Sequence, residues 1–179
     1  MNQDCINSDA QADLPDFWDE RSEILNWANI TYRYHRKRQW FFDLCDKVTQ
    51  GASVIVGLVV VSGKTVADHA PLVGFSIAAC GVLALVFGYA DRKQAHKEIA
   101  EKARKLGGEI QPIRNADITI AMLIKWEGQR TEIDISEPPN LPTLVAVCEW
   151  EEACVQSHVQ PADRPKRPCL LARLHMHFW

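Results

Sequence analysis

The stretch APLVGFSIAACGVLALVFGYADRK, residues 70–93, carries no charge until it ends in an Asp-Arg-Lys triplet. As a helix rising about 1.5 Å per residue, residues 70–90 would extend roughly 30 Å, which is the thickness of the hydrocarbon core of a bilayer. Pro71 suits the first turn of such a helix, because its missing N–H group costs no hydrogen bond there. Residues 70–90 therefore predict a transmembrane helix.

A second uncharged segment, residues 48–63, precedes the first. It is slightly shorter than the usual transmembrane range of about 17–25 residues. Lys47 and Lys64 flank it and can extend their ammonium groups to the two headgroup layers, which lengthens the usable span. The connection at residues 64–69 is short enough to join two antiparallel helices across an external loop. The two segments together predict a transmembrane helical hairpin.

Basic residues concentrate on one side of this predicted hairpin. The connection holds Lys64 alone, whereas many basic residues precede the first span or follow the second: Arg33, Arg36, Lys37, Arg38, Lys47, Arg92, Lys93, Lys97, Lys102, Arg104 and Lys105. This asymmetry predicts that both termini are cytoplasmic. The alternative is a soluble helical domain that buries both segments, but neither segment shows the polar stripe expected of a helix facing water.

Helical patterns on both sides of the hairpin predict an all-α fold. Residues 1–15 are expected to be flexible, and residues 16–47 form a helix that runs into the first span, since no glycine or proline lies between Pro15 and Gly51. Residues 91–160 first continue the second helix until Gly107-Gly108. Further helices, one capped by Asp117 and one after Pro138-Pro139, complete a small cytoplasmic helical bundle. Residues 161–179 are a proline-rich tail with a short amphipathic end.

Small residues recur along both spans and predict a helix-packing seam, consisting of Gly74, Ala78, Gly81, Gly88, Ser53 and Gly57. Small side chains let helices approach closely in lipid. The seam serves either the packing of the two spans within one chain or the self-association of several copies. Because neither span contains Asp, Glu, Lys or Arg, a pore would have to be surrounded by several copies.

A belt of basic and aromatic residues borders the spans and predicts contact with lipid headgroups; its members are Arg33, Arg36, Lys37, Arg38, Trp40, Arg92 and Lys93. A mixture of basic and aromatic side chains also suits nucleic acid. The position beside a span and the net charge of −3 favour the bilayer as the partner, and we expect no nucleic acid.

The sequence contains no phosphate loop, dinucleotide-binding fingerprint, nucleophile elbow or zinc-protease helix. We therefore expect no enzymatic activity and no cofactor. The only candidate metal ligands, Cys169, His175 and His177, fall short of the four that a structural zinc site requires, so we expect no metal site. The six cysteines show no paired spacing and predict no disulfide framework.

Three stretches of the chain, in this order, resemble the SLATT family of two-transmembrane effectors from bacterial conflict systems. They are YRYHRKRQWFFDLCDKVTQGASVIVG at 32–57, LVFGYADRKQAHKEIAEKARKL at 85–106 and EIDISEPPNLPTLVAVCEWE at 132–151. The resemblance implies a multimeric protein of the bacterial inner membrane that forms a pore or depolarises the membrane in an anti-phage response. It implies a nucleotide-signalling or sensor protein as partner and no catalytic residue. The alternative is a non-conducting membrane adaptor that recruits a partner through its cytoplasmic helices.

Overall fold

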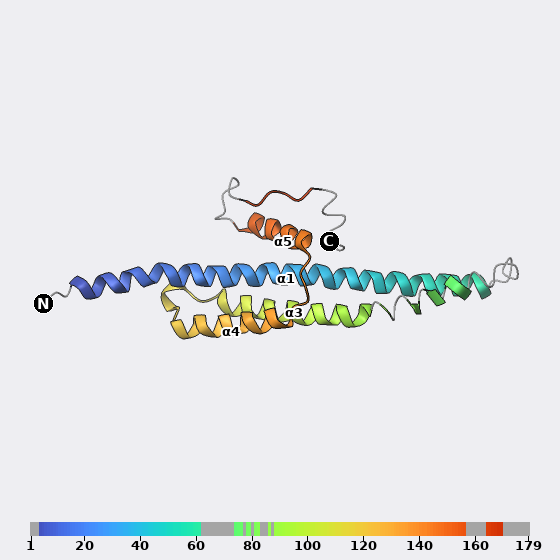
Figure 1. Ribbon diagram of the computed structural model, residues 1–179, viewed down its shortest axis with the longest axis horizontal. Helices are drawn as coiled ribbons and strands as arrows, with labels where there is room; N and C mark the ends of the chain where they lie inside the picture. The colour runs from blue at the N-terminus through green and yellow to red at the C-terminus, as the bar shows by residue number, and fades with distance from the viewer. Residues whose placement is uncertain are drawn as a thin grey trace. The chain divides into compact units, whose positions relative to one another are not determined.

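The computed structural model of the protein describes residues 4–61, 74–76, 78–79, 81–82, 86, 88–156 and 164–169. Within these ranges the chain is helical and contains no strand (Figure 1), so the all-α prediction is confirmed. The elements are α1 (Asp4–Val61), α3 (Tyr89–Ile110), the 3-10 helix η1 (Asn115–Asp117), α4 (Ile120–Ser136) and α5 (Pro142–Val155). Two compact units result: the bundle unit, Met1–His35 with Glu98–Trp179, and the middle unit, Arg36–Lys97.

Helix α1 is one uninterrupted helix from Asp4 to Val61, as the absence of glycine and proline between Pro15 and Gly51 predicted. It therefore runs without a break from residues 16–47 into the first predicted span. The helix begins earlier than expected, because it also includes residues 4–15, which we expected to be flexible. Pro15, which was expected to precede the helix, lies inside it, and residues 4–14 on its N-terminal side contain no glycine or proline that would interrupt the helix.

The core of the bundle unit forms where α1, α3 and α4 meet. Its buried members are Ile24, Ala28, Ile99, Leu106, Ile110, Leu123, Trp126 and Ile133. Within each helix many of these positions are three or four residues apart, which places them on one face. The part of residues 91–160 from Glu98 onward shares this core with the part of α1 up to His35, whereas residues 91–97 belong to the middle unit.

Helix α5 packs on α1 through a second, smaller cluster. Tyr34, Leu144 and Cys148 are buried there. The phenolic oxygen of Tyr34 accepts a hydrogen bond from the backbone N–H of Leu141 at 3.0 Å, just before the helix begins. Pro142 occupies the first turn of α5, where proline is favourable. The helix predicted after Pro138-Pro139 is thus confirmed.

Two glycines near the end of α3 do not stop the helix as predicted, because α3 continues through them to Ile110. Gly107 faces α1: a Cβ atom built on it would lie 3.7 Å from Oδ1 of Asn29 and 3.8 Å from Cδ1 of Leu25. Packing against α1 holds this part of α3 in the helical conformation. Long-range contact therefore overrides the low helix propensity of the glycine pair.

We expect Gly107→Ala and Gly108→Ala each to stabilise the bundle unit by roughly 0.5–1 kcal/mol, because alanine loses less backbone entropy on folding. A Cβ at Gly108 meets open space, and one at Gly107 lies at ordinary contact distances of 3.7–4.0 Å. Urea unfolding followed by circular dichroism measures both effects. A loss of stability confined to Gly107→Ala would mean that α1 and α3 lie closer together than described.

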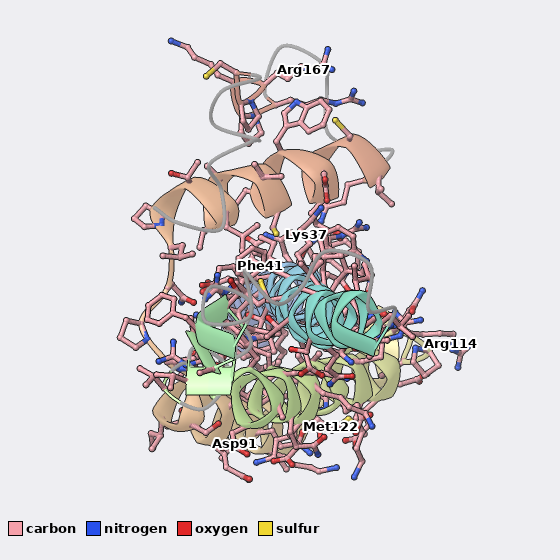
Figure 2. The ribbon with its side chains drawn as sticks, turned by 90° about the vertical axis from the view of Figure 1, so that its right-hand side faces the viewer. Lys37, Phe41, Asp91, Arg114, Met122 and Arg167 are labelled. Atoms are coloured by element: carbon pink, nitrogen blue, oxygen red, sulfur yellow. The ribbon has the colours of Figure 1, made fainter. Side chains whose placement is uncertain are left out.

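Asp117 does not cap α4 as predicted. The helix begins after Thr119, and Asp117 lies in η1 instead. There its carboxylate accepts hydrogen bonds from Arg114 at 2.9 and 3.4 Å. Arg114 projects from the surface of the bundle unit (Figure 2), so this ion pair is exposed and contributes little to stability.

Candidate functional site

The middle unit carries a set of exposed large apolar side chains, which we call the apolar surface. Its members, each 57% to 74% exposed, are Val48, Val54, Ile55, Leu58, Phe75, Val82 and Val86. The α1 members are spaced so that Val48 and Ile55 lie two turns apart on one face, with Leu58 one turn further. Isolated exposed apolar residues are ordinary, but a series of this kind indicates contact with another protein or with lipid.

Just before the apolar surface begins on α1, an ion pair joins α1 to α3. The Asp43 carboxylate lies 2.7 Å from Nζ of Lys47 and 2.6 Å from Nζ of Lys93. Hydrogen bonds from Lys47 and then Lys93 hold the pKa of the Asp43 carboxyl below its ordinary value, and Asp43 in turn raises the pKa of Lys93. One carboxylate thus holds two ammonium groups at the point where the uncharged sequence of α1 begins.

Aromatic rings pack beside this ion pair. Phe42 is buried and stacks on the His96 ring, with 5.5 Å between centroids and 12° between planes. The Arg38 guanidinium lies 4.6 Å from the centroid of Phe42, which is a cation–π distance. These contacts fix α1 against α3 within the middle unit.

The predicted headgroup belt is divided between internal contacts and the surface. Arg33 forms an ion pair with Glu152 inside the bundle unit at 2.7 Å, and Lys93 pairs with Asp43. Arg36 and Arg92 are exposed. Trp40, one turn after Arg36 on α1, is exposed as well. Lys37 is half-buried on α1 (Figure 2). The structure therefore leaves Arg36, Trp40 and Arg92 at the surface, and their contact with lipid stays a prediction.

Three glycines of the predicted packing seam have no neighbour in the described part of the chain. No atom lies within 4 Å of a Cβ built on Gly57, Gly74 or Gly81, and Ala78 is exposed. The Ser53 hydroxyl donates a hydrogen bond to the carbonyl of Thr49 at 3.0 Å. In the described part of the chain the two spans do not pack on each other through these residues, so the seam is open to other contacts.

Gly88 differs from the other seam residues. Its φ of +53° lies in the left-handed region that glycine adopts readily. Its carbonyl accepts a hydrogen bond from the N–H of Arg92 at 3.0 Å in the first turn of α3. The prediction that the second span continues without a break into the following helix is wrong at this residue. Gly88 marks a turn that begins α3, ahead of Asp91 (Figure 2).

Among the helices that the structure describes, none is both long enough and apolar enough to cross a membrane. The first predicted span lies in α1 up to Val61, while the external loop at 64–69 and much of the second span at 70–90 lie outside the described residues. Of the proline-rich tail only residues 164–169 are described, and there the Arg167 guanidinium lies 5.5 Å from the centroid of the Trp150 ring.

A buried carboxylate in the bundle unit was not predicted. Glu152 of α5 is 4% exposed and accepts hydrogen bonds from Arg33 Nε at 2.7 Å and Asn29 Nδ2 at 3.1 Å. Its position one turn after Cys148 and two turns after Leu144 is a sequence signal for the buried face of α5. This ion pair attaches α5 to α1.

His35 is a second buried polar residue. Its side chain is fully buried, and Nε2 lies 2.9 Å from Oε1 of Glu137 in the segment between α4 and α5. The histidine ring packs edge-on against Tyr34, with 5.0 Å between centroids. The contact between His35 and Glu137 fixes the connection between α4 and α5.

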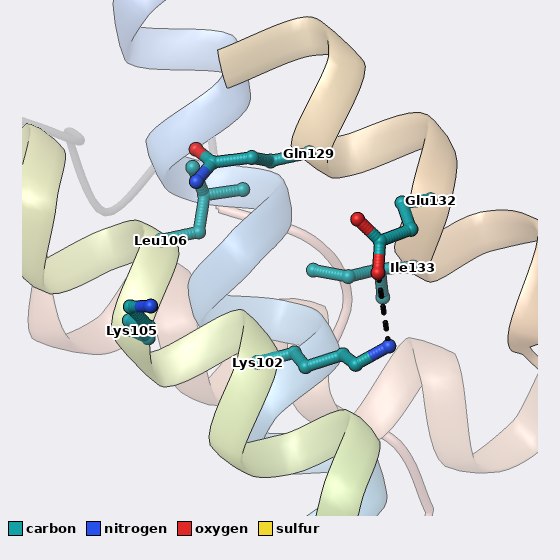
Figure 3. A pocket seen from close by; sticks show the side chains of 6 residues that line it. All are labelled: Lys102, Lys105, Leu106, Gln129, Glu132 and Ile133. Atoms are coloured by element: carbon teal, nitrogen blue, oxygen red, sulfur yellow. Dashed lines mark hydrogen bonds and ion pairs between the residues drawn. The ribbon is translucent and has the colours of Figure 1, made fainter. Parts of the chain in front are cut away.

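Two of the cavities on the bundle unit are lined by described residues. A groove of about 370 Å³ is lined by Trp27 and Tyr34 and by acidic residues that include Glu23, Asp134 and Glu149. Arg130 also lines it; its guanidinium pairs with Glu23 at 3.2 Å and lies 5.4 Å from the centroid of the Trp27 ring. A smaller one, of about 200 Å³, lies between α3 and α4, where Lys102 and Glu132 form an ion pair at 3.2 Å (Figure 3). The first is an acidic groove with aromatic residues in its lining, which suits a cationic segment of a partner.

We expect Asp134→Asn to stabilise the bundle unit at neutral pH by less than about 1 kcal/mol. Partial burial, and then the neighbouring Glu137, raise the pKa of the Asp134 carboxyl above its ordinary value of 3.8. The folded state therefore loses stability as the pH rises from 3.8 through the raised pKa, and asparagine removes this loss. Unfolding at pH 7 and at pH 3 measures it: the gain should disappear at the lower pH.

Among the described residues, no three histidine, cysteine, aspartate or glutamate side chains come together as a metal site. Cys169 of the candidate trio is exposed, and His175 and His177 lie outside the described residues. Comparison of the chain with protein-family models, with curated proteins and with solved structures found no significant match. The resemblance to the SLATT family therefore rests on the three stretches of sequence that carry it.

Proposed function

We propose that this chain is a bacterial inner-membrane protein that inserts its apolar segments, oligomerises in the bilayer and permeabilises or depolarises it. The observation that carries this proposal is the apolar surface, which continues α1 beyond the Asp43–Lys93 ion pair. Exposed apolar area costs about 25 cal/mol per Å² in water. Several half-exposed valine, isoleucine and leucine side chains on one helix end are therefore favourable only against an apolar partner.

The bilayer fits this surface better than a soluble protein partner does. Residues 48–63 and 70–90 contain no charged side chain, and their lengths match a hydrocarbon core more closely than the patch of a protein interface. Asp43 and Lys47 before the first segment form ion pairs, and Lys93 after the second joins them, as expected at a headgroup boundary. With basic residues before the first span and after the second, both termini would remain in the cytoplasm.

Oligomerisation is supported by the seam. Gly57, Gly74 and Gly81 face open space in the single chain, so another helix can approach their backbones closely. A pore built in this way would be lined by backbone and small polar groups such as Ser53, because the spans hold no charged side chain. The resemblance to the SLATT family supports the same activity.

Controlled expression in bacteria carrying a potential-sensitive dye tests the proposal. We expect depolarisation, and we expect the protein to resist alkaline extraction of the membranes. Gly74→Leu with Gly81→Leu should keep insertion but remove depolarisation, because the larger side chains block the seam. The matched control is Val82→Leu, which enlarges an exposed neighbour outside the seam. Unchanged polarisation by the unsubstituted protein, or its release at alkaline pH, contradicts the proposal.

The acidic groove favours a second function, that of a non-conducting membrane adaptor. A lining that includes Glu23, Asp134 and Glu149 together with Trp27 is complementary to a basic, partly apolar segment of a partner protein. An adaptor of this kind would resist alkaline extraction yet leave the membrane potential intact. Loss of partner co-purification on Glu149→Lys, with polarisation unchanged throughout, would favour it over the effector.

A further inference from the structure

The solvent-facing side of α4 carries an uncharged stripe, which we call the α4 stripe: Ile120, Ile124, Gly128, Thr131 and Ile135. At 100° per residue these positions lie within about 80° of one another, while the core residues Trp126 and Ile133 lie on the opposite side. Its three isoleucines are 60%, 69% and 82% exposed. No atom lies within 4 Å of a Cβ built on Gly128. The stripe is wide and continuous enough to pack against another helix.

The order of residues along the stripe is nearly the same in both directions. If a second α4 lies antiparallel with its centre at Gly128, Ile120 meets Ile135 of the second copy and Ile124 meets Thr131. The two Gly128 residues then meet at the centre, where the lack of side chains permits a close approach. A surface that is complementary to its own copy is the property required of a two-fold symmetric interface.

The charges beside the stripe include a pair that is complementary in the antiparallel arrangement. Lys125 and Glu132 border one edge, and in this arrangement the lysine of each copy faces the glutamate of the other. Glu127 and Arg130 repeat the pattern on the other edge, where they already form an ion pair at 3.6 Å within one copy. The two Glu127 residues also come close to each other at the centre, where Arg130 of the same copy offsets the charge of each.

The ion pairs that Lys125 and Glu132 form within one copy allow them to pair with a second copy as well. Lys125 pairs with Glu109 at 3.1 Å, and Glu132 pairs with Lys102 at 3.2 Å (Figure 3). The Lys125 and Glu132 side chains are both more than half exposed, so sharing them with a second copy costs little.

We propose that the α4 stripe is an interface between two copies of this chain, arranged antiparallel about Gly128. The acidic flanks Glu127, Glu132 and Asp134 make an anionic lipid surface a poorer partner than a second copy. One helix of this length spans about 25 Å, so the contact is small and we expect dissociation in the micromolar range in solution. The contact belongs to the bundle unit and does not rest on the proposed membrane activity.

Cysteine cross-linking of the full chain tests this contact. The native cysteines are replaced, Cys148 by alanine because it is buried and the others by serine, and Gly128→Cys is added. Antiparallel pairing about this position brings two thiols within disulfide distance, so an added oxidant should yield a linked dimer. The control keeps only Cys154, which is exposed on α5. Equal yields from both proteins, or none from Gly128→Cys, would refute the interface.

Charge exchange tests the arrangement independently in sedimentation experiments on the full chain in detergent. Lys125→Glu and Glu132→Lys should each weaken the association roughly tenfold, and the double substitution should restore it, because attraction across the edge returns. Ile124→Glu should abolish the association, whereas Val155→Glu, an equally exposed position on α5, should not. If Ile124→Glu leaves the association intact and instead lowers binding to anionic vesicles, the stripe contacts lipid and the proposal fails.

Discussion

Replacing Trp126 with alanine is expected to destabilise the bundle unit by about 3–5 kcal/mol, a large part of the stability of an ordinary domain. The indole is 2% exposed and belongs to the cluster that joins α4 to Ile24 of α1 and Leu106 of α3. Alanine would leave a cavity that three helices line, and helices can close such a cavity only in part. Urea unfolding of the full chain, followed at the helical circular dichroism band, measures the loss.

Trp18→Ala is the matched control for this substitution, since Trp18 is 45% exposed and lies outside the buried cluster. Its removal should cost less than about 1 kcal/mol, including the cation–π contact with Arg21, whose guanidinium lies 5.7 Å from the ring centroid. Similar losses from the two tryptophans would contradict the placement of Trp126 at the centre of the bundle.

The elements that the sequence predicts correctly are those set by neighbouring residues. Helix α1 is continuous over residues 16–50 because these contain neither glycine nor proline. Pro138 and Pro139 interrupt the helical conformation, and Pro142 then favours the first turn of α5. The spacing of Ile24, Leu25 and Trp27 also indicates a helix with an apolar face. Signals of this kind act within a few residues, so they can be recognised in the sequence without knowledge of the fold.

The elements that the sequence does not predict depend on distant contacts. The helix ends at Ile110 and not at Gly107, because α1 packs against the glycine from a part of the chain far away in sequence. Periodicity places Glu152 on a buried face, but only the fold shows that Arg33 supplies its partner. Likewise the left-handed backbone of Gly88 is compatible with its sequence, which also fits a helix.

In the candidate site, too, local features could be predicted from the sequence and distant contacts could not. Composition identifies the apolar segments and the basic belt around them, but charge alone cannot distinguish a lysine that meets a lipid phosphate from one that meets a carboxylate of its own chain. Arg33 and Lys93 belong to the second kind in the structure, whereas Arg36 and Arg92 stay at the surface. The seam glycines are open because nothing in the described chain covers them, which local sequence does not reveal.

Ile55→Arg combined with Leu58→Arg is expected to abolish membrane insertion and depolarisation while leaving the bundle unit folded. Both side chains are 64% exposed and belong to the middle unit, so arginine, a good helix former, removes no core contact. In the hydrocarbon core each arginine costs about 2.5–3.5 kcal/mol, and two on one short span exceed what the remaining apolar residues supply. Alkaline extraction and a potential-sensitive dye measure the two effects in the same cells.

Leu44→Arg provides the control, because Leu44 is exposed on α1 but precedes Lys47 and the predicted span and does not belong to the headgroup belt. At the headgroup level arginine is tolerated, so this variant should insert and depolarise as the unsubstituted protein does. If the pair at 55 and 58 also inserts normally, α1 does not enter the hydrocarbon core, and the exposed apolar side chains must contact protein. Loss of function in the control alone would place the critical contact before the span.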